Sequence, residues 1–258
     1  MFNWFKNRRR KKYLEMEFSK EWLDILNKEM PLYITLNEQD KRELEATLKI
    51  LYHEKEFIGA HGLLVTEEMK VLICAEASLL LLHRPKDYFP NVNTIVIYET
   101  TFCSEIRQPL AGGFSLSKKE ARIGESNHHT KTVVLAWDSV KGQALNPHSG
   151  RNVVLHEFAH QLDSETGIVN GAPRLSSNSS YRAWANIMSS EFNHLKDDIK
   201  HHHKTFIDQY GATSGAEFFA VITESFFEKP ITFKRKHPDL YDQLQGFYKQ
   251  DPTSYVKR

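Results

Sequence analysis

The chain has 258 residues, enough for one large domain or two small ones with a proper core. Its hydrophobic share of 40% and charged share of 26% are those of a globular protein. The formal net charge of +1 gives no strong field for nucleic acid or for an acidic substrate, so no specific nucleic-acid partner is expected. No run of about 18 apolar residues occurs, so no membrane span is expected.

Residues 1–12 form a basic cluster after a very short apolar piece, without the apolar core or cleavage site of a signal peptide. Such a cluster could contact anionic lipid or nucleic acid, but a solvated tail is the commoner structure. We therefore expect a basic N-terminal tail over 1–18, one domain over 19–250 and a C-terminal tail over 251–258.

The apolar pattern predicts a mainly helical chain with two buried strands. Ser, Asn, Gly and Pro positions mark where helices begin and where loops interrupt them. The elements expected, in chain order, are helices within 19–56 capped by Ser19 and Asn37, a central buried helix over 67–83, a strand over 94–98, strand remnants and loop over 107–130, a strand over 132–137, a loop over 164–180 and a helix over 181–194.

The motif H-E-x-x-H occurs at His156, Glu157 and His160. Residues four apart lie on one face of a helix, so both histidines can point at one spot and supply two of the three protein ligands of a catalytic zinc. Glu157 can take a proton from the water that zinc activates. A turn cluster at 146–150 precedes the motif, and the many apolar neighbours predict a buried helix, in which unpaired His and Glu side chains would be costly.

The third ligand is not part of this motif, because the downstream histidine of the longer H-E-x-x-H-x-x-G-x-x-H pattern is missing. A carboxylate on a second helix is the expected replacement. Residues 210–227 predict such a helix, with Ser214 as N-cap and two carboxylates, Glu217 and Glu224, seven apart on one face. Glu217 also fits a capping box with Ser214, so the residues alone leave the choice nearly even.

The run HEFAHQLD at 156–163, with YGATSGAEFFAVITESFF at 210–227, resembles the Mlc titration factor A family of bacterial zinc peptidases. Further matching stretches lie within 57–92, so the resemblance covers about residues 22 to 248. The catalytic core of that family is similar to the anthrax lethal factor protease domain. The resemblance therefore implies a zincin-like metallopeptidase domain of the α+β class, mostly helical, with a small sheet beside the H-E-x-x-H helix.

For the site, the resemblance implies one Zn²⁺ per chain with Glu217 as its third ligand and Glu157 as the general base. Tyr210 then becomes a hydroxyl near the metal that can donate to a developing oxyanion. Glu224 becomes a candidate for orienting a ligand. Asp163 either orients a ligand or bonds the loop that follows the motif helix, and the residues favour neither.

We expect hydrolysis of peptide or amide bonds by a zinc-activated water. Aminopeptidase-like cleavage is one form of this activity that we expect. The strand before the motif helix suggests how a peptide substrate is held. Our hypothesis is that this strand is a sheet edge that pairs with extended substrate, and an interior strand is the alternative. The residues concerned are Val133, Val134, Leu135 and Ala136.

The resemblance also implies a protein partner, because the named member of the family sequesters Mlc, a glucose-responsive transcriptional repressor. A regulatory protein with secondary peptidase activity is therefore the alternative function. A structural zinc site fits less well, because three protein ligands beside a Glu base leave an open position. The two cysteines, Cys74 and Cys103, lie in apolar segments and predict buried free thiols, which fits a cytoplasmic location.

Overall fold

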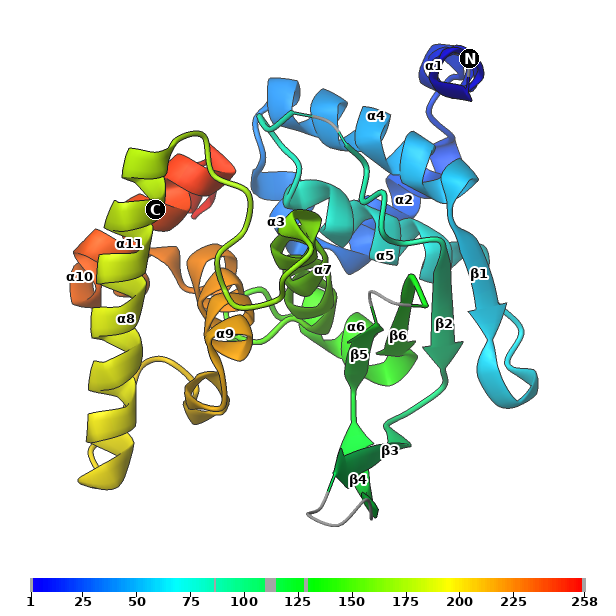
Figure 1. Ribbon diagram of the computed structural model, residues 1–258. Helices are drawn as coiled ribbons and strands as arrows, with labels where there is room; N and C mark the ends of the chain where they lie inside the picture. Colours follow the sequence, from blue (N-terminus) through cyan, green and yellow to red (C-terminus); the bar gives the residue numbers. More distant parts are fainter. Residues whose placement is uncertain (1, 86, 110–114, 128–129, 257–258) are drawn as a thin grey trace.

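The computed structural model describes residues 2–85, 87–109, 115–127 and 130–256, without the side chains of 2–3, 103–109, 115–121 and 178. The described chain is mostly helical with one small mixed sheet, which confirms the α+β class (Figure 1). The helices are α1 (Phe2–Glu15), α2 (Lys20–Glu29), α3 (Pro31–Thr35), α4 (Glu38–Glu54), α5 (Glu67–Leu79), α6 (Trp137–Ala144), α7 (Val153–Asp163), α8 (Asn178–Lys200), α9 (Gly215–Glu228), α10 (Pro230–Lys236) and α11 (Pro238–Tyr248), with short 3₁₀ turns η1 (Ala60–Gly62), η2 (Ser164–Thr166), η3 (Gln209–Ala212) and η4 (Pro252–Tyr255).

The main sheet has the strand order β1-β2-β6-β5. The pairs β1/β2 and β2/β6 are parallel, and β5/β6 is antiparallel. A separate antiparallel hairpin, β3/β4, extends beyond one end of this sheet (Figure 1). The strands are β1 (Glu56–Gly59), β2 (Thr94–Tyr98), β3 (Phe102–Pro109), β4 (Ser115–Arg122), β5 (Gly124–Asn127) and β6 (Thr132–Ala136).

The β6 strand is interior, so the hypothesis that Val133, Val134, Leu135 and Ala136 form the sheet edge is wrong. β6 pairs along its whole length with β2 on one side and with β5 on the other. Val133, Leu135 and Ala136 are buried. A continuous apolar run is typical of a strand that is covered on both faces of its sheet. In this sheet β6 also has a neighbouring strand at each of its two edges, β2 and β5. The terminal strand beside α7 is β5.

Two helices were not expected from the sequence. The first is α6, which lies between β6 and α7, so the strand does not lead directly into the motif helix. The second is α1, which replaces the predicted solvated tail. Lys49 Nζ donates to the carbonyls of Leu14 and Met16 at its end, at 2.8 and 2.6 Å. Because these contacts are polar, the spacing of apolar residues in the sequence did not indicate that α1 packs against the domain. The limits of the predicted domain over 19–250 stay a prediction.

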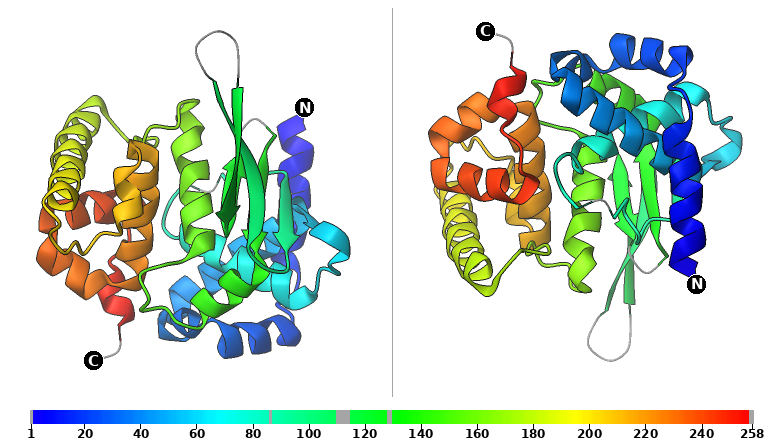
Figure 2. Two further views of the ribbon diagram at one scale, coloured as in Figure 1. Left: turned by 90° about the horizontal axis from the view of Figure 1, so that it is seen from below. Right: turned by 90° about the horizontal axis from the view of Figure 1, so that it is seen from above.

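The core surrounds α5, which is buried along its length as predicted. Asn37 caps α4 through its side chain, whereas Ser19 begins α2 without a side-chain cap bond. The α7 helix lies between the sheet and the C-terminal helices α8 to α11, with α9 packed against it (Figure 2).

Cys74 is buried and free, and the side chain of Cys103 lies outside the described residues. None of the helices described is both long and apolar enough to cross a membrane.

Candidate metal centre

The start of α7 is fixed by side chains rather than by the turn cluster alone. Asn152 is the N-cap, and its side-chain oxygen accepts the amide of Leu155 at 2.9 Å. The amide of Val153 donates to Gln143 Oε1 at 2.6 Å, so a second free N–H of the first turn is bonded. Phe158 is buried on the inner side of the helix. These contacts fix which face of α7 turns toward α9.

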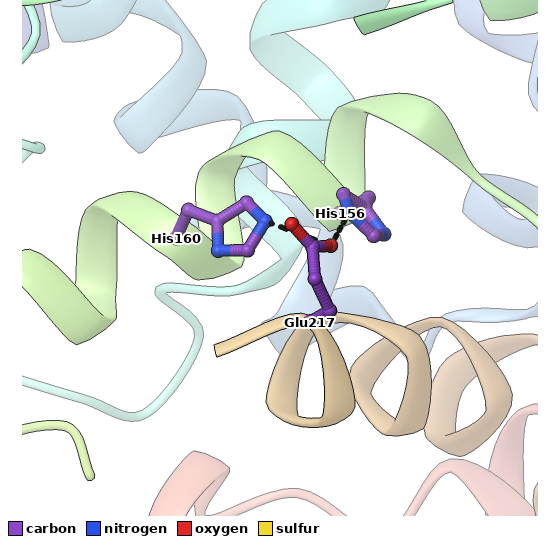
Figure 3. A group of neighbouring side chains, drawn as sticks. All are labelled: His156, His160 and Glu217. Atoms are coloured by element: carbon purple, nitrogen blue, oxygen red, sulfur yellow. Dashed lines mark hydrogen bonds and ion pairs between the residues drawn. The ribbon is translucent and has the colours of Figure 1, made fainter. Parts of the chain in front are cut away.

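The carboxylate of Glu217 meets both histidines of the motif. Its Oε2 lies 3.0 Å from His156 Nε2 and 3.4 Å from His160 Nε2 (Figure 3). Ser214 caps α9 as predicted, and its hydroxyl accepts the amide of Glu217 at 3.2 Å. The Glu217 side chain nevertheless extends across to α7. The backbone amide of Glu217 therefore takes part in the helix cap, while its carboxylate contacts both histidines.

The three residues fit a divalent metal ion. One ligand atom from each of His156, His160 and Glu217 lies within 4.8 Å of the others, and two imidazoles with one carboxylate form the donor set of a catalytic zinc. Burial alone would lower the pKa of His156, but Glu224 and Glu217 raise it well above its usual value. Burial also opposes ionisation of Glu217, yet the two histidines hold the pKa of this carboxyl far below its usual range. The cluster thus stabilises positive charge at the point where the three side chains converge.

Glu224 contacts His156 on the side of the ring away from Glu217. Its Oε1 accepts a hydrogen bond from Nδ1 of His156 at 2.7 Å, and its Oε2 accepts the amide of Asn152 at 2.6 Å. The side-chain amide of Asn152 donates in turn to Glu76 Oε1 at 2.5 Å. Burial raises the pKa of Glu76 to about 8. A buried polar chain therefore connects the central helix α5 with the motif helix.

Glu157 is buried at the floor of the site, and burial raises the pKa of its carboxyl, with Glu217 and Glu224 adding to the effect. Gly124 of β5 lies directly against it. A methyl group on Gly124 would overlap Glu157 Oε1 and the side chain of Val153. Gly124 was not among the residues predicted for the site, although a glycine within a strand is a known sign of close approach between the backbone and a neighbour.

Tyr210 lies in η3 with about half of its surface exposed, and its ring centroid is 6.0 Å from that of His156. Its amide donates to Asp208 Oδ1 at 3.0 Å, and Asp208 Oδ2 accepts Arg151 Nη2 at 2.7 Å. Burial opposes ionisation of Asp208, but these two hydrogen bonds lower the pKa of its carboxyl. The ion pair with Arg151 joins η3 to the segment before α7, and no local sequence pattern indicates it.

Asp163 bonds the loop after the motif helix. Its Oδ2 accepts the amide of Gly171 at 2.7 Å, and the carbonyl of Gly171 accepts Trp184 Nε1 at 2.8 Å. Of the two alternatives for Asp163, the hydrogen bonds favour loop anchoring. This contact holds the segment from η2 to α8 against the end of α7.

A pocket of about 550 Å³ opens over these residues. Its floor is α7, and its walls come from β5, α9 and η3. The residues of the predicted site that line it are His156, Glu157, His160, Tyr210, Glu217 and Glu224, whereas Asp163 and the strand residues Val133, Val134, Leu135 and Ala136 do not.

The comparisons with known proteins agree with this geometry. A family profile described as "Glucose-regulated metallo-peptidase M90" matches residues 4–249. The chain belongs to this family. An M90 protein is a metallopeptidase by the family's description, which accounts for a His-His-Glu cluster beside a buried Glu.

Relatives of this M90 protein share most of its length. An uncharacterized protein of Synechocystis sp. is 34% identical over 246 residues, covering 95% of this chain and 89% of the relative. The Mlc titration factor A of Serratia proteamaculans is 29% identical over 241 residues, covering 92% and 90%. The Mlc titration factor A of Yersinia pestis is 28% identical over 247 residues, covering 95% and 89%. The resemblance inferred from the sequence motifs is thereby confirmed.

Proposed function

We propose that this M90 protein is a zinc-dependent peptidase that hydrolyses peptide or amide bonds, with one Zn²⁺ held by His156, His160 and Glu217 in a zincin-like domain. The observation that carries the proposal is the convergence of these three side chains above Glu157 in one pocket. Family membership supports the metallopeptidase class, and the donor set supports zinc.

A bound Zn²⁺ supplies Lewis acidity, which polarises a substrate carbonyl and makes a water molecule more acidic. Glu157 accepts the proton of the attacking water and passes it to the leaving amine. The burial of Glu157 raises the pKa of its carboxyl, which suits a group that must both take and return a proton. The hydroxyl of Tyr210, a residue that lines the pocket, donates a hydrogen bond to the oxyanion that develops on the substrate.

Extended substrate binds along β5 instead of β6. The carbonyl of Ile123 accepts the amide of Ala136 at 2.8 Å, so this pair is a hydrogen-bonded one in the antiparallel ladder. Hydrogen-bonded and non-hydrogen-bonded pairs alternate, and the backbone groups of Gly124 and Ser126 therefore point toward the free edge. Ser126→Pro should raise KM by removing an N–H, and Ser126→Ala, which keeps the backbone, should not. Equal KM values for both variants would contradict binding along β5.

We propose that the cleavage is aminopeptidase-like. Two carboxylates line the pocket besides those of the site, Glu125 and Asp208, and either offers an anion to a substrate ammonium group. Because a carboxylate attracts an ammonium group, a substrate with a free N-terminus should be preferred over one with an acetylated N-terminus. Each carboxylate also lies near an arginine, Glu125 at 3.4 Å from Arg122 and Asp208 at 2.7 Å from Arg151.

The test is turnover of short peptide and amino-acid p-nitroanilides, each with a free and an acetylated N-terminus. Wild type and Glu157→Gln are compared at equal zinc content. Turnover by wild type alone supports the peptidase, and preference for free N-termini supports the aminopeptidase form. Turnover that survives Glu157→Gln would overturn the proposed chemistry.

A second candidate function is supported by the relatives named Mlc titration factor A. We propose that the protein also binds a transcriptional repressor of the Mlc type, in the cytoplasm. Binding to an outer surface would not require Glu157. A purified Mlc-type repressor should bind wild type and Glu157→Gln equally, and absence of binding to either would reject this candidate.

A further inference from the structure

The N-terminal helix α1 is held against the domain by one face. Arg10 donates two hydrogen bonds to the carboxylate of Glu54, at 2.8 and 2.7 Å, and its guanidinium lies 4.3 Å from the centroid of the Tyr88 ring. Tyr13 stacks on His53 with ring centroids 4.5 Å apart. Arg10 and Tyr13 are three positions apart, as one helix face requires. The orientation of α1 is therefore fixed.

The opposite face of α1 carries aromatic and basic side chains. Trp4 and Phe5 are 60% and 55% exposed, and their rings meet edge to face at 5.0 Å. Glu15 is the single acid of the helix and lies 3.8 Å from Lys11. The exposed basic residues that share this outer surface with the aromatic pair are Arg8, Arg9, Lys11 and Lys12.

The charge of the chain is concentrated in this helix. It holds six of the 34 lysines and arginines but one of the 33 acids, so its net charge is +5, and the rest of the printed sequence has −4. The helix lies at the periphery, on the side of the molecule away from the C-terminal helices (Figures 1 and 2). A flat surface can therefore meet α1 without contacting the pocket over α7.

We propose that α1 is a docking surface for an anionic lipid bilayer, independent of the peptidase site. Clustered Lys and Arg side chains are attracted by anionic headgroups, and Trp and Phe insert at the boundary between headgroups and acyl chains. The helix lies in the plane of the surface and does not cross it. Nucleic acid is the less suited partner, because a long polyanion would extend beyond α1 onto a net acidic remainder.

The test is sedimentation of the full chain with phosphatidylcholine vesicles, with and without phosphatidylglycerol. We expect binding to the anionic vesicles alone, decreasing with salt. Each positive charge removed should weaken binding by roughly fivefold, so Arg9→Gln/Lys12→Gln should lose about 25-fold. The matched control, Lys200→Gln/Lys204→Gln, removes two exposed charges at the end of α8 and should bind like wild type.

The aromatic pair is tested separately. Trp4→Ala/Phe5→Ala should weaken binding to anionic vesicles, whereas Leu64→Ala, which removes another highly exposed apolar side chain, should not. Thermal melts of all variants check that the fold is kept. Two results would overturn the proposal: equal binding to both vesicles, or no binding to either vesicle, whether or not duplex DNA or RNA is retained.

Discussion

The carboxylate of Glu224 accepts a hydrogen bond from Nδ1 of His156 at 2.7 Å, on the opposite side of the ring from Glu217. An ionised carboxylate can only accept, so this contact selects the tautomer with a proton on Nδ1. In the neutral ring that a metal requires, the lone pair is then on Nε2, which is the atom that faces Glu217 and His160. In the proposed zinc site, Glu224 would therefore orient His156 and would not itself be a ligand.

The first prediction concerns this orientation. Glu224→Ala should weaken zinc affinity by roughly 10- to 100-fold, because the imidazole loses its partner. Glu224→Gln should lose less, since its amide oxygen can still accept the Nδ1–H. Zinc dissociation constants from competition with a chromogenic chelator measure the effect. Unchanged affinity in both variants would remove Glu224 from this role.

The roles of the other two glutamates can be separated by binding and turnover together. Glu157→Gln should keep zinc and lose turnover, because an amide is no base. Glu217→Ala should lose zinc affinity as well as turnover, because it removes one of three protein ligands. Metal content after gel filtration distinguishes them, and equal zinc loss in the two variants would contradict the assignment.

Gly124 provides a test of the close approach between β5 and α7. Gly124→Ala should lower kcat/KM by roughly tenfold or more, because the added methyl displaces the Glu157 carboxylate. The control is Gly142→Ala in α6, where a methyl meets no atom within 4 Å and should stabilise the helix slightly. If Gly124→Ala retains the kcat/KM of wild type, Glu157 does not depend on this contact.

Tyr210→Phe removes a hydroxyl and keeps the ring. If the hydroxyl donates only to the oxyanion, kcat should fall by roughly 100-fold while KM changes little. The melting temperature should stay the same, because about half of the side chain is exposed. A rise in KM without loss of kcat would instead indicate a role in ground-state binding.

Stability should fall as pH rises because of a buried carboxyl behind the site. Burial raises the pKa of Glu228 to about 9, with Glu76 and Glu224 adding to the shift. Below about pH 4.5 the carboxyl is protonated in both the folded and unfolded states. As pH rises toward 9 the unfolded state ionises while the folded state keeps its proton, so the free energy of unfolding decreases.

Glu228→Gln removes this ionisation. The variant should match wild type near pH 4 and exceed it by roughly 1–3 kcal/mol near pH 8, as measured by urea unfolding. A constant difference between the two proteins across this pH range would show that Glu228 is already ionised in the folded state.

Local signals predicted the parts of the site that depend on neighbours in the sequence. The four-residue spacing of His156 and His160 defines one helix face, and Ser214 caps α9 through a residue three positions away. Both signals lie within one helical turn. The choice between Glu217 and Glu224 was different, because the two share a face, and only the crossing of α7 and α9 determines which one contacts Nε2 of both histidines.

Strand order could not be predicted, because it depends on which distant segments pair. The strand that covers β6 is β5, a short run of Gly124, Glu125, Ser126 and Asn127 without an apolar residue. Such a run carries no apolar alternation, so the sequence predicted only strand remnants and loop there and did not decide between an edge and an interior position for β6. Likewise, α1 is held by the distant polar partners Glu54 and Lys49, which no local pattern reveals.

The central claim is that peptidase activity depends on one metal ion at the His-His-Glu site. The most direct measurement is a titration of chelator-stripped wild type with Zn²⁺, in which turnover and bound zinc are followed together. Turnover that rises in proportion to bound zinc and stops rising at one ion per chain is the predicted result. Full turnover in the stripped protein, or one bound zinc per chain with no turnover on any substrate, would contradict it.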